Sequence, residues 1–355
     1  MKGSLKTLDG IKKEVTRLER VKQDYLTGTE ELSYLDDNSI TMGKALYTPN
    51  NHAHGQIAAR YRIPKAYYDR MGEIEGLRRY TMNEWFKQDE KPHFIRTYAE
   101  PGGNTMRAFL SDTFNPVFDN ILAVQAILPV LTEQQAVKNL SIMASGISER
   151  RLYIQVLFPK LEGEIKVGQP VQYGITISNS EVGVGTYNVE EFIGELRCMN
   201  GYVAQSLLRR RHVGKRLGGE SGEDFAAYRK DTIEAEIQAY RLRLRDLITA
   251  ALEPAHFEAH LNRFREAAGV PISKGKFETV LKNVTRTYSF NETEEQAVMD
   301  NFIQGGELNK LGVAQAVTAT AKQVVENLDR QYDLERIGNQ IIDLDRSAWR
   351  TLHNN

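Results

Sequence analysis

Three strand-like segments that follow one another directly constrain the fold more than any other feature of this sequence. Apolar and polar residues alternate over 151–158, and the alternation returns over 171–178. A third segment places Phe192, Gly194, Leu196 and Cys198 on one face. A period of two is typical of β-strands with one buried face. Because no helical pattern separates these segments, they predict an antiparallel or mixed sheet and argue against a doubly wound parallel one.

Helical patterns lie on both sides of these strands. Residues 4–26 carry apolar side chains every third or fourth residue, and this spacing returns over 223–268 and again after Thr293. A further hairpin is expected where 94–98 and 105–111 flank the turn-forming residues 100–104. We therefore predict an α+β fold, with a central, mainly antiparallel sheet of hairpins flanked by N- and C-terminal helices. The predicted regions are a helical region at 1–90, a sheet core at 91–220 and a helical region at 221–355 that packs on the core.

Composition places the chain among globular proteins. Of 355 residues, 41% are hydrophobic and 26% are charged, which argues against disorder. Without a signal-peptide core or an apolar run of roughly 18 residues, we expect a cytoplasmic protein outside the membrane. The lone Cys198 excludes an internal disulfide and fits a reducing compartment; we expect its thiol to be buried and unreactive.

A run of cations is the main candidate site. Arg209, Arg210, Arg211, Lys215 and Arg216 follow one another with no acidic residue before Gly219. A guanidinium binds two phosphate oxygens at once and stays charged at any working pH. With a net charge of only −1, polyanion binding has to come from such a local patch. The alternatives are a solvated surface segment and a contact with an acidic protein.

Arg96 and Arg107 form a second candidate set on the two strands of the predicted hairpin. On an exposed sheet face they would follow a phosphate backbone while Tyr98 and Phe109 stack on bases. Alternatively, Arg107 pairs with Asp112 or Asp119 and fixes the turn. The sequence leaves both interpretations open.

The segment from Asn179 to Gly185 predicts a tight connection between two strands. Asn and Ser satisfy turn backbone, and Gly183 and Gly185 can take positive φ. The alternative is that Glu181 acts as a base or a metal ligand, although no partner for it is apparent nearby in the sequence.

Two histidines and several missing motifs bear on catalysis. His256 and His260 share a helix face in the order H-x-E-x-H, and no third ligand is identifiable, so we interpret them as surface histidines without a metal. The chain has no phosphate-binding loop, no G-x-S-x-G, no kinase motifs and no dinucleotide fingerprint. We therefore expect no cofactor, and no catalytic constellation is evident.

Four stretches of the sequence carry a family resemblance. They are Ile63-Pro64 with 67–70; 95–97 with 106–112 and Asp119-Asn120; 177–185 with 197–201; and 316–319. On these stretches the chain resembles a family of phage- and plasmid-borne proteins, domain-of-unknown-function family 932 (DUF932). The resemblance covers roughly residues 55–340, and Phe118, inserted before Asp119, departs from it. It makes Asn179, Ser180, Glu181, Gly183, Asn200 and Gly201 family-motif residues. It implies an origin in mobile elements but no specific activity.

Together these features predict a DNA-binding protein of a phage or plasmid, without enzymatic activity. We expect it to hold single-stranded DNA during annealing, recombination or replication, and a homo-oligomer is one form in which it would do so. Annealing proteins of the Rad52 type combine a sheet of hairpins with a long helix, and this analogy concerns the fold alone. One alternative is a metal-dependent or acid/base enzyme acting on nucleic acid or nucleotides through Glu181 and Asp112. Another is a protein that binds a host factor.

Overall fold

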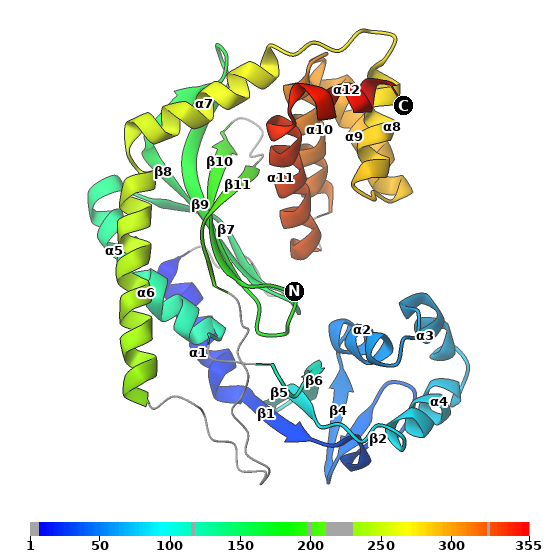
Figure 1. Ribbon diagram of the computed structural model, residues 1–355. Helices are drawn as coiled ribbons and strands as arrows, with labels where there is room; N and C mark the ends of the chain where they lie inside the picture. The colour runs from blue at the N-terminus through cyan, green and yellow to red at the C-terminus, as the bar shows by residue number, and fades with distance from the viewer. Residues whose placement is uncertain (1–6, 115–117, 197–200, 211–229, 325–326, 355) are drawn as a thin grey trace.

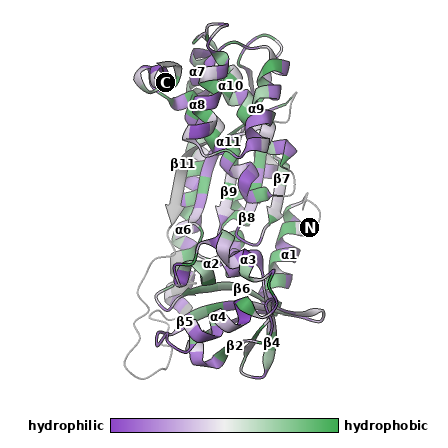
Figure 2. Cartoon of the chain, turned by 90° about the vertical axis from the view of Figure 1, so that its right-hand side faces the viewer, coloured by the Kyte–Doolittle hydropathy of each residue, from purple (hydrophilic) through white to green (hydrophobic). Residues whose placement is uncertain are grey.

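All of the named strands belong to two sheets, which lie one after the other along the long axis of the molecule (Figure 1). The chain was analysed as a computed structural model that describes residues 7–114, 118–196, 201–210, 230–324 and 327–354. The first sheet lies at one end, the second in the middle and most of the C-terminal helices at the other end, as Figures 1 and 2 both show. The predicted α+β class, with mostly antiparallel sheets and flanking helices, is confirmed. Within the described ranges, no helix combines the length and the apolar character that a bilayer-spanning segment requires.

The first sheet has the strand order β1-β5-β6-β4-β3-β2. Only β4 and β6 pair in parallel; the other neighbours are antiparallel. The helices α2 (Asn51–Arg60), α3 (Lys65–Met71) and α4 (Leu77–Phe86) pack on this sheet around a core of Tyr34, Tyr68 and Phe86. The strands are β1 (Lys22–Thr27), β2 (Leu32–Tyr34), β3 (Ile40–Met42), β4 (Ala45–Pro49), β5 (His93–Glu100) and β6 (Gly103–Ser111).

The region 1–90, predicted as helical, contains four strands of the first sheet beside its helices. Strands β2 and β3 have only three residues each, too few to show an alternating pattern. The predicted boundary at residue 90 therefore divides the first sheet. The hairpin predicted around 100–104 is confirmed as β5 and β6.

The second sheet is an antiparallel meander with the order β11-β10-β9-β8-β7. Its middle strands are buried on both faces, because helices cover both sides. The predicted strands at 151–158 and 171–178 correspond to β8 and β9, with β8 beginning one residue later, whereas Cys198 lies outside the described residues. The strands are β7 (Ser141–Ile147), β8 (Leu152–Glu164), β9 (Pro170–Asn179), β10 (Tyr187–Glu195) and β11 (Gly201–Arg210).

Helices cover the two faces of the second sheet in different ways. The helices α5 (Asn120–Lys138), α6 (Lys230–Ala251) and α7 (Pro254–Ala268) lie on one side, and α11 (Leu328–Asp343) lies on the other (Figure 1). The remaining C-terminal helices are α8 (Phe277–Thr287), α9 (Glu292–Gly305), α10 (Lys310–Gln323) and α12 (Arg346–Asn354). Asn291 and Glu294 close a capping box at the start of α9, which explains why that helix begins there.

The first helix belongs to the second sheet although it precedes the first. Helix α1 (Leu8–Val21) buries Ile11 and Val15 in the core that α5 and the second sheet share. The next residue, Lys22, opens β1 of the first sheet. The chain therefore passes from the core of the second sheet into the first sheet between the adjacent residues Val21 and Lys22.

Candidate functional site

The structure describes the beginning of the cationic run. Arg209 and Arg210 are the last residues of β11, and their backbones pair with Asn188 and Tyr187 of β10. Strand β11 is the last strand in the order of its sheet, so it forms an edge. Arg211, Lys215 and Arg216 lie outside the described residues. The run thus starts at the end of an edge strand.

Sequence reasoning missed three exposed arginines in α6, the next element after the run. Tyr240, Leu244 and Ile248 hold α6 to the core, while Arg241, Arg243 and Arg245 are exposed. Arg245 donates to the neighbouring Asp246 at 2.9 Å. Within the described part of the chain, Arg241 and Arg243 have no ion-pair partner. The signal was present as alternating Arg and Leu over 241–245, but only the apolar spacing of this region entered the prediction.

Of the two interpretations of Arg96 and Arg107, the one that places them on an exposed sheet face is wrong. The Arg96 side chain is 0% exposed and donates to Asp24 and Asp119, and to the backbone oxygen of Glu181 at 2.8 Å. Arg107 is also buried, and its Nη2 donates to Oε2 of Glu181 at 2.5 Å. The two guanidiniums therefore pair with carboxylates of the chain itself.

The aromatic residues of the same hairpin are also engaged in the interior. The Arg107 guanidinium lies 3.9 Å from the centroid of the Tyr98 ring, and Phe109 is buried in the core of the first sheet. An exposed surface for stacking bases is therefore absent from this hairpin as the described residues present it. Neither alternative partner that the sequence suggested for Arg107 is used, since Arg107 pairs with Glu181. Asp119 pairs with Arg96, and Asp112 accepts from Ser111.

The segment 179–185 connects β9 to β10 and joins three parts of the chain. Nδ2 of the buried Asn179 donates to Oδ1 of Asn120 at 2.9 Å. Oγ of Ser180 donates to the backbone oxygen of Arg150 at 2.8 Å, and Oε1 of Glu181 accepts from the backbone nitrogen of Asn120 at 2.8 Å. The segment is a tight strand connection, as one of the two interpretations predicted.

Gly183 is the glycine that this connection requires. Its φ is +80°, and a Cβ atom would lie 2.7 Å from Cδ2 of Leu110. Gly185 does not take a positive φ. Asn200 lies outside the described residues, and Gly201 opens β11 against the ring of Phe192. The inserted Phe118 is buried and packs on Tyr187 and Tyr240.

Opposite charges balance one another where these segments meet. Burial raises the pKa of Asp119, but Arg96 and Lys22 outweigh burial and hold that pKa below its usual value. Burial lowers the pKa of Arg96, yet its acidic neighbours raise that pKa well above the usual value. Both groups therefore stay charged at neutral pH. We name Asp24, Arg96, Arg107, Asp119 and Glu181 the junction network.

Neither acid/base nor metal chemistry is favoured in this network. Glu181 is bound by Arg107, Asp112 is exposed beside Ser111, and no contact among the described residues joins the two acids. Ligand atoms of Glu19, Asp119 and Glu181 all lie within 4.8 Å of one another. However, Nζ of Lys22 already bridges Glu19 and Asp119 at 2.6 and 2.7 Å. The chain itself supplies the cation that these carboxylates need.

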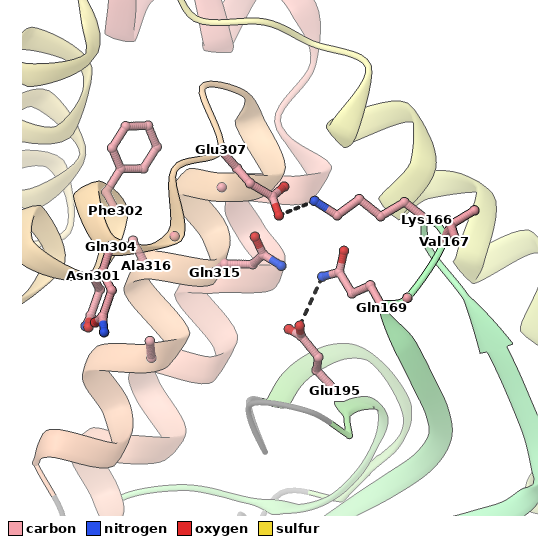
Figure 3. A pocket seen from close by; sticks show the side chains of 14 residues that line it. Lys166, Val167, Gln169, Glu195, Asn301, Phe302, Gln304, Glu307, Gln315 and Ala316 are labelled. Carbon is pink, nitrogen blue, oxygen red and sulfur yellow. Dashed lines mark hydrogen bonds and ion pairs between the residues drawn. The ribbon is translucent and has the colours of Figure 1, made fainter.

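A pocket of about 540 Å³ lies between the turn after β8 and the helices α9 and α10 (Figure 3). Lys166 pairs with Glu307 across it, and Nε2 of Gln169 donates to Oε1 of Glu195 at 3.1 Å. Burial raises the pKa of Glu195. The volume of the pocket is in the range of small-molecule sites, and the carboxylates and amides that line the pocket suit a ligand that donates hydrogen bonds. None of the residues in the predicted sites lines this pocket.

His256 and His260 have the third partner that the sequence did not reveal. Glu191 of β10 lies against both imidazoles. Glu191 and His256 are 65 positions apart in the sequence and meet because α7 crosses the second sheet. No local sequence pattern indicates such a contact.

Comparison with protein-family models, with curated proteins and with solved structures returned no match. The function therefore has to be argued from the chain itself.

Proposed function

We propose that this is a phage- or plasmid-type DNA-binding protein, related to DUF932, that holds single-stranded DNA in the cytoplasm during annealing, recombination or replication. The observation that carries the proposal is the run of cations without an acidic residue that begins with Arg209 and Arg210 at the end of the edge strand β11. The exposed Arg241 and Arg243 of α6 support it, because they add cations to the next element.

The physical argument rests on local charge. Five cationic residues lie between 209 and 216, and the sequence has no acidic residue from 209 until Glu220. The chain as a whole, in contrast, has a net charge of −1. Phosphate contacts release counterions from the nucleic acid, so this binding has to weaken as salt increases. The order of a five-stranded meander followed by a long helix agrees with the fold-level analogy to annealing proteins.

The test is fluorescence anisotropy with labelled single- and double-stranded oligonucleotides over a salt series. If all five cations of the run contact phosphates, the slope of log K against log salt is about −3.5 for a single strand. The triple variant Arg209→Ala/Arg210→Ala/Arg211→Ala should reduce the magnitude of that slope by about 2. The pair Arg241→Ala/Arg243→Ala should reduce it by about 1.4 if both contact the strand.

A matched control removes the same charge elsewhere. Lys12, Lys44 and Lys91 are exposed, and their triple alanine variant should retain the wild-type slope. A wild-type slope near zero, or equal losses in both triple variants, would contradict the phosphate assignment. Preferred binding of the duplex would overturn the single-strand assignment. Light scattering of the same samples would show whether binding forms a homo-oligomer.

The alternatives predict different results. An enzyme using Glu181 and Asp112 would lose turnover in Glu181→Gln while DNA binding persists, but the pairing of Glu181 with Arg107 weighs against it. A protein that binds an acidic host factor would show no salt-sensitive oligonucleotide binding at all.

A further inference from the structure

We propose that Glu191, His256 and His260 form a binding site for a divalent transition metal, with Zn²⁺ as the best match. The inference is independent of DNA binding, because none of these residues belongs to the cationic run or to the junction network.

Three ligand atoms converge at one point of the second sheet. His256 and His260 are one turn apart on α7, and Glu191 approaches from β10. The three ligand atoms all lie within 4.8 Å of one another. Two imidazole nitrogens and one carboxylate oxygen form a set that zinc sites use.

The carboxylate of Glu191 supplies a second, independent observation. Its side chain is 2% exposed, and its Oε2 lies 2.7 Å from Nε2 of His260. Without a metal, this oxygen is in ion-pair contact with His260, although the two atoms do not have hydrogen-bond geometry. A buried carboxylate oxygen without a well-aligned donor is costly, and a cation held between it and the imidazoles would satisfy it.

Neighbouring groups orient this carboxylate and pack beside it. The hydroxyl of Tyr173 donates to Oε1 of Glu191 at 3.1 Å, as outer partners of metal ligands commonly do. The rings of Tyr173 and Phe257 pack together beside the cluster.

The site has three protein ligands and one side open to solvent. The His256 side chain is 42% exposed, so a water molecule can reach the fourth position of a tetrahedral ion. Closed structural zinc sites use four protein ligands instead. A metal here would also fix α7 to β10.

Arg263 influences the affinity for the metal because it contacts Nδ1 of His260, the ring nitrogen that does not face the proposed site. Its Nη1 lies 3.0 Å from Nδ1 of His260 and donates to it, which places the imidazole proton on Nε2. A metal at Nε2 requires that proton on Nδ1, so Arg263 has to turn away and keep its pairing with Asp343. Because ligating histidines favour an acceptor at this position, Arg263→Gln should bind metal more tightly than the wild type.

The experiment is titration of the metal-free full chain with Co²⁺, followed by visible absorption, and then competition with Zn²⁺. We expect one Co²⁺ per chain with the intense bands of a four-coordinate ion. His256→Ala removes a partly exposed ligand and should weaken binding at least about 100-fold, since even outer partners contribute 10–100-fold. Glu191→Gln should also weaken it. His52→Ala removes a histidine outside the cluster and should leave the affinity unchanged.

Circular dichroism would verify that each variant is folded. Absence of stoichiometric Co²⁺ binding to the wild type would overturn the proposal and leave a metal-free His–Glu–His cluster. Equal affinity of the wild type and His256→Ala would overturn it as well. Metal binding without any DNA binding would refute the proposed function while leaving this site intact.

Discussion

Arg96 shows how much one side chain contributes to the contact between the two sheets. Its fork binds Asp24 of β1 and Asp119 at the start of α5, and a backbone oxygen that follows β9. These partners are 72, 23 and 85 positions away in the sequence. A planar guanidinium satisfies such a set of acceptors, whereas a lysine ammonium cannot reproduce the paired geometry.

We predict that Arg96→Met lowers the free energy of unfolding by about 3–5 kcal/mol, because it leaves Asp119 buried without its main counter-charge. Chemical denaturation at neutral pH would measure the loss. Arg70→Met is the control, since Arg70 is exposed on α3 and should change stability by no more than about 0.5 kcal/mol. Equal effects of the two substitutions would contradict the assignment of Arg96.

The same residues show what sequence can and cannot reveal about a site. Residue types were sufficient to select Arg96, Arg107 and the segment around Glu181, and the structure brings all of them together. Their burial could not be predicted, because it depends on partners that are distant in the sequence. Glu191 was missed for the same reason, since an acidic residue within a strand gives no sign of two histidines on a later helix.

At the scale of elements, α11 packs on the second sheet through polar side chains. Asp329 accepts from Tyr153 at 2.6 Å and from Ser148 at 2.9 Å. One turn later Tyr332 donates to Glu190, and beyond it Glu335 accepts from Gln155 at 2.6 Å. Helical periodicity predicted this segment from its apolar residues. The polar contacts could not be predicted, because their partners lie on strands far earlier in the chain.

We predict a pH-dependent effect of Glu335→Gln. Burial raises the pKa of Glu335 from 4.5 to about 7. Because the folded value is the higher one, the stability that this group contributes is complete below 4.5 and is lost as pH rises to about 7. The amide stays neutral at every pH, so the variant should gain stability relative to the wild type at pH about 8 and not at pH about 4.

Urea denaturation of both proteins at the two pH values would measure this difference. Other titrating groups are shared and cancel in the comparison. A difference that does not change with pH would show that Glu335 titrates as it does in the unfolded chain.

At the scale of the whole molecule, the chain enters the first sheet directly from α1 at the start of β1 and leaves that sheet after β6. Helix α1 buries Ile11 at 0% exposure in the core of the second sheet, and the junction network follows where the chain returns. The sequence predicted α1 as an amphipathic helix correctly. Its partners could not be inferred from periodicity, which reports which face is buried but not against what.

We predict that Ile11→Ala destabilises the molecule by about 2–5 kcal/mol, through lost burial and the cavity left behind. Ile74→Ala is a matched control, since Ile74 is 59% exposed and should change stability by no more than about 0.5 kcal/mol. Thermal unfolding followed by calorimetry would measure both. If Ile11→Ala unfolds at a temperature no lower than that of Ile74→Ala, α1 does not belong to the core of the second sheet.

The position of α1 also affects how the protein is made. A ribosome releases residues 8–21 more than a hundred residues before α5 and the second sheet are complete. During that time the first sheet can finish, because its last strand ends at Ser111. The apolar face of the helix, however, has to wait without a partner, and nascent chains with such exposed surface are prone to aggregate. This helix therefore emerges long before its partners do, and a chaperone that shields amphipathic helices would help this chain most during that interval.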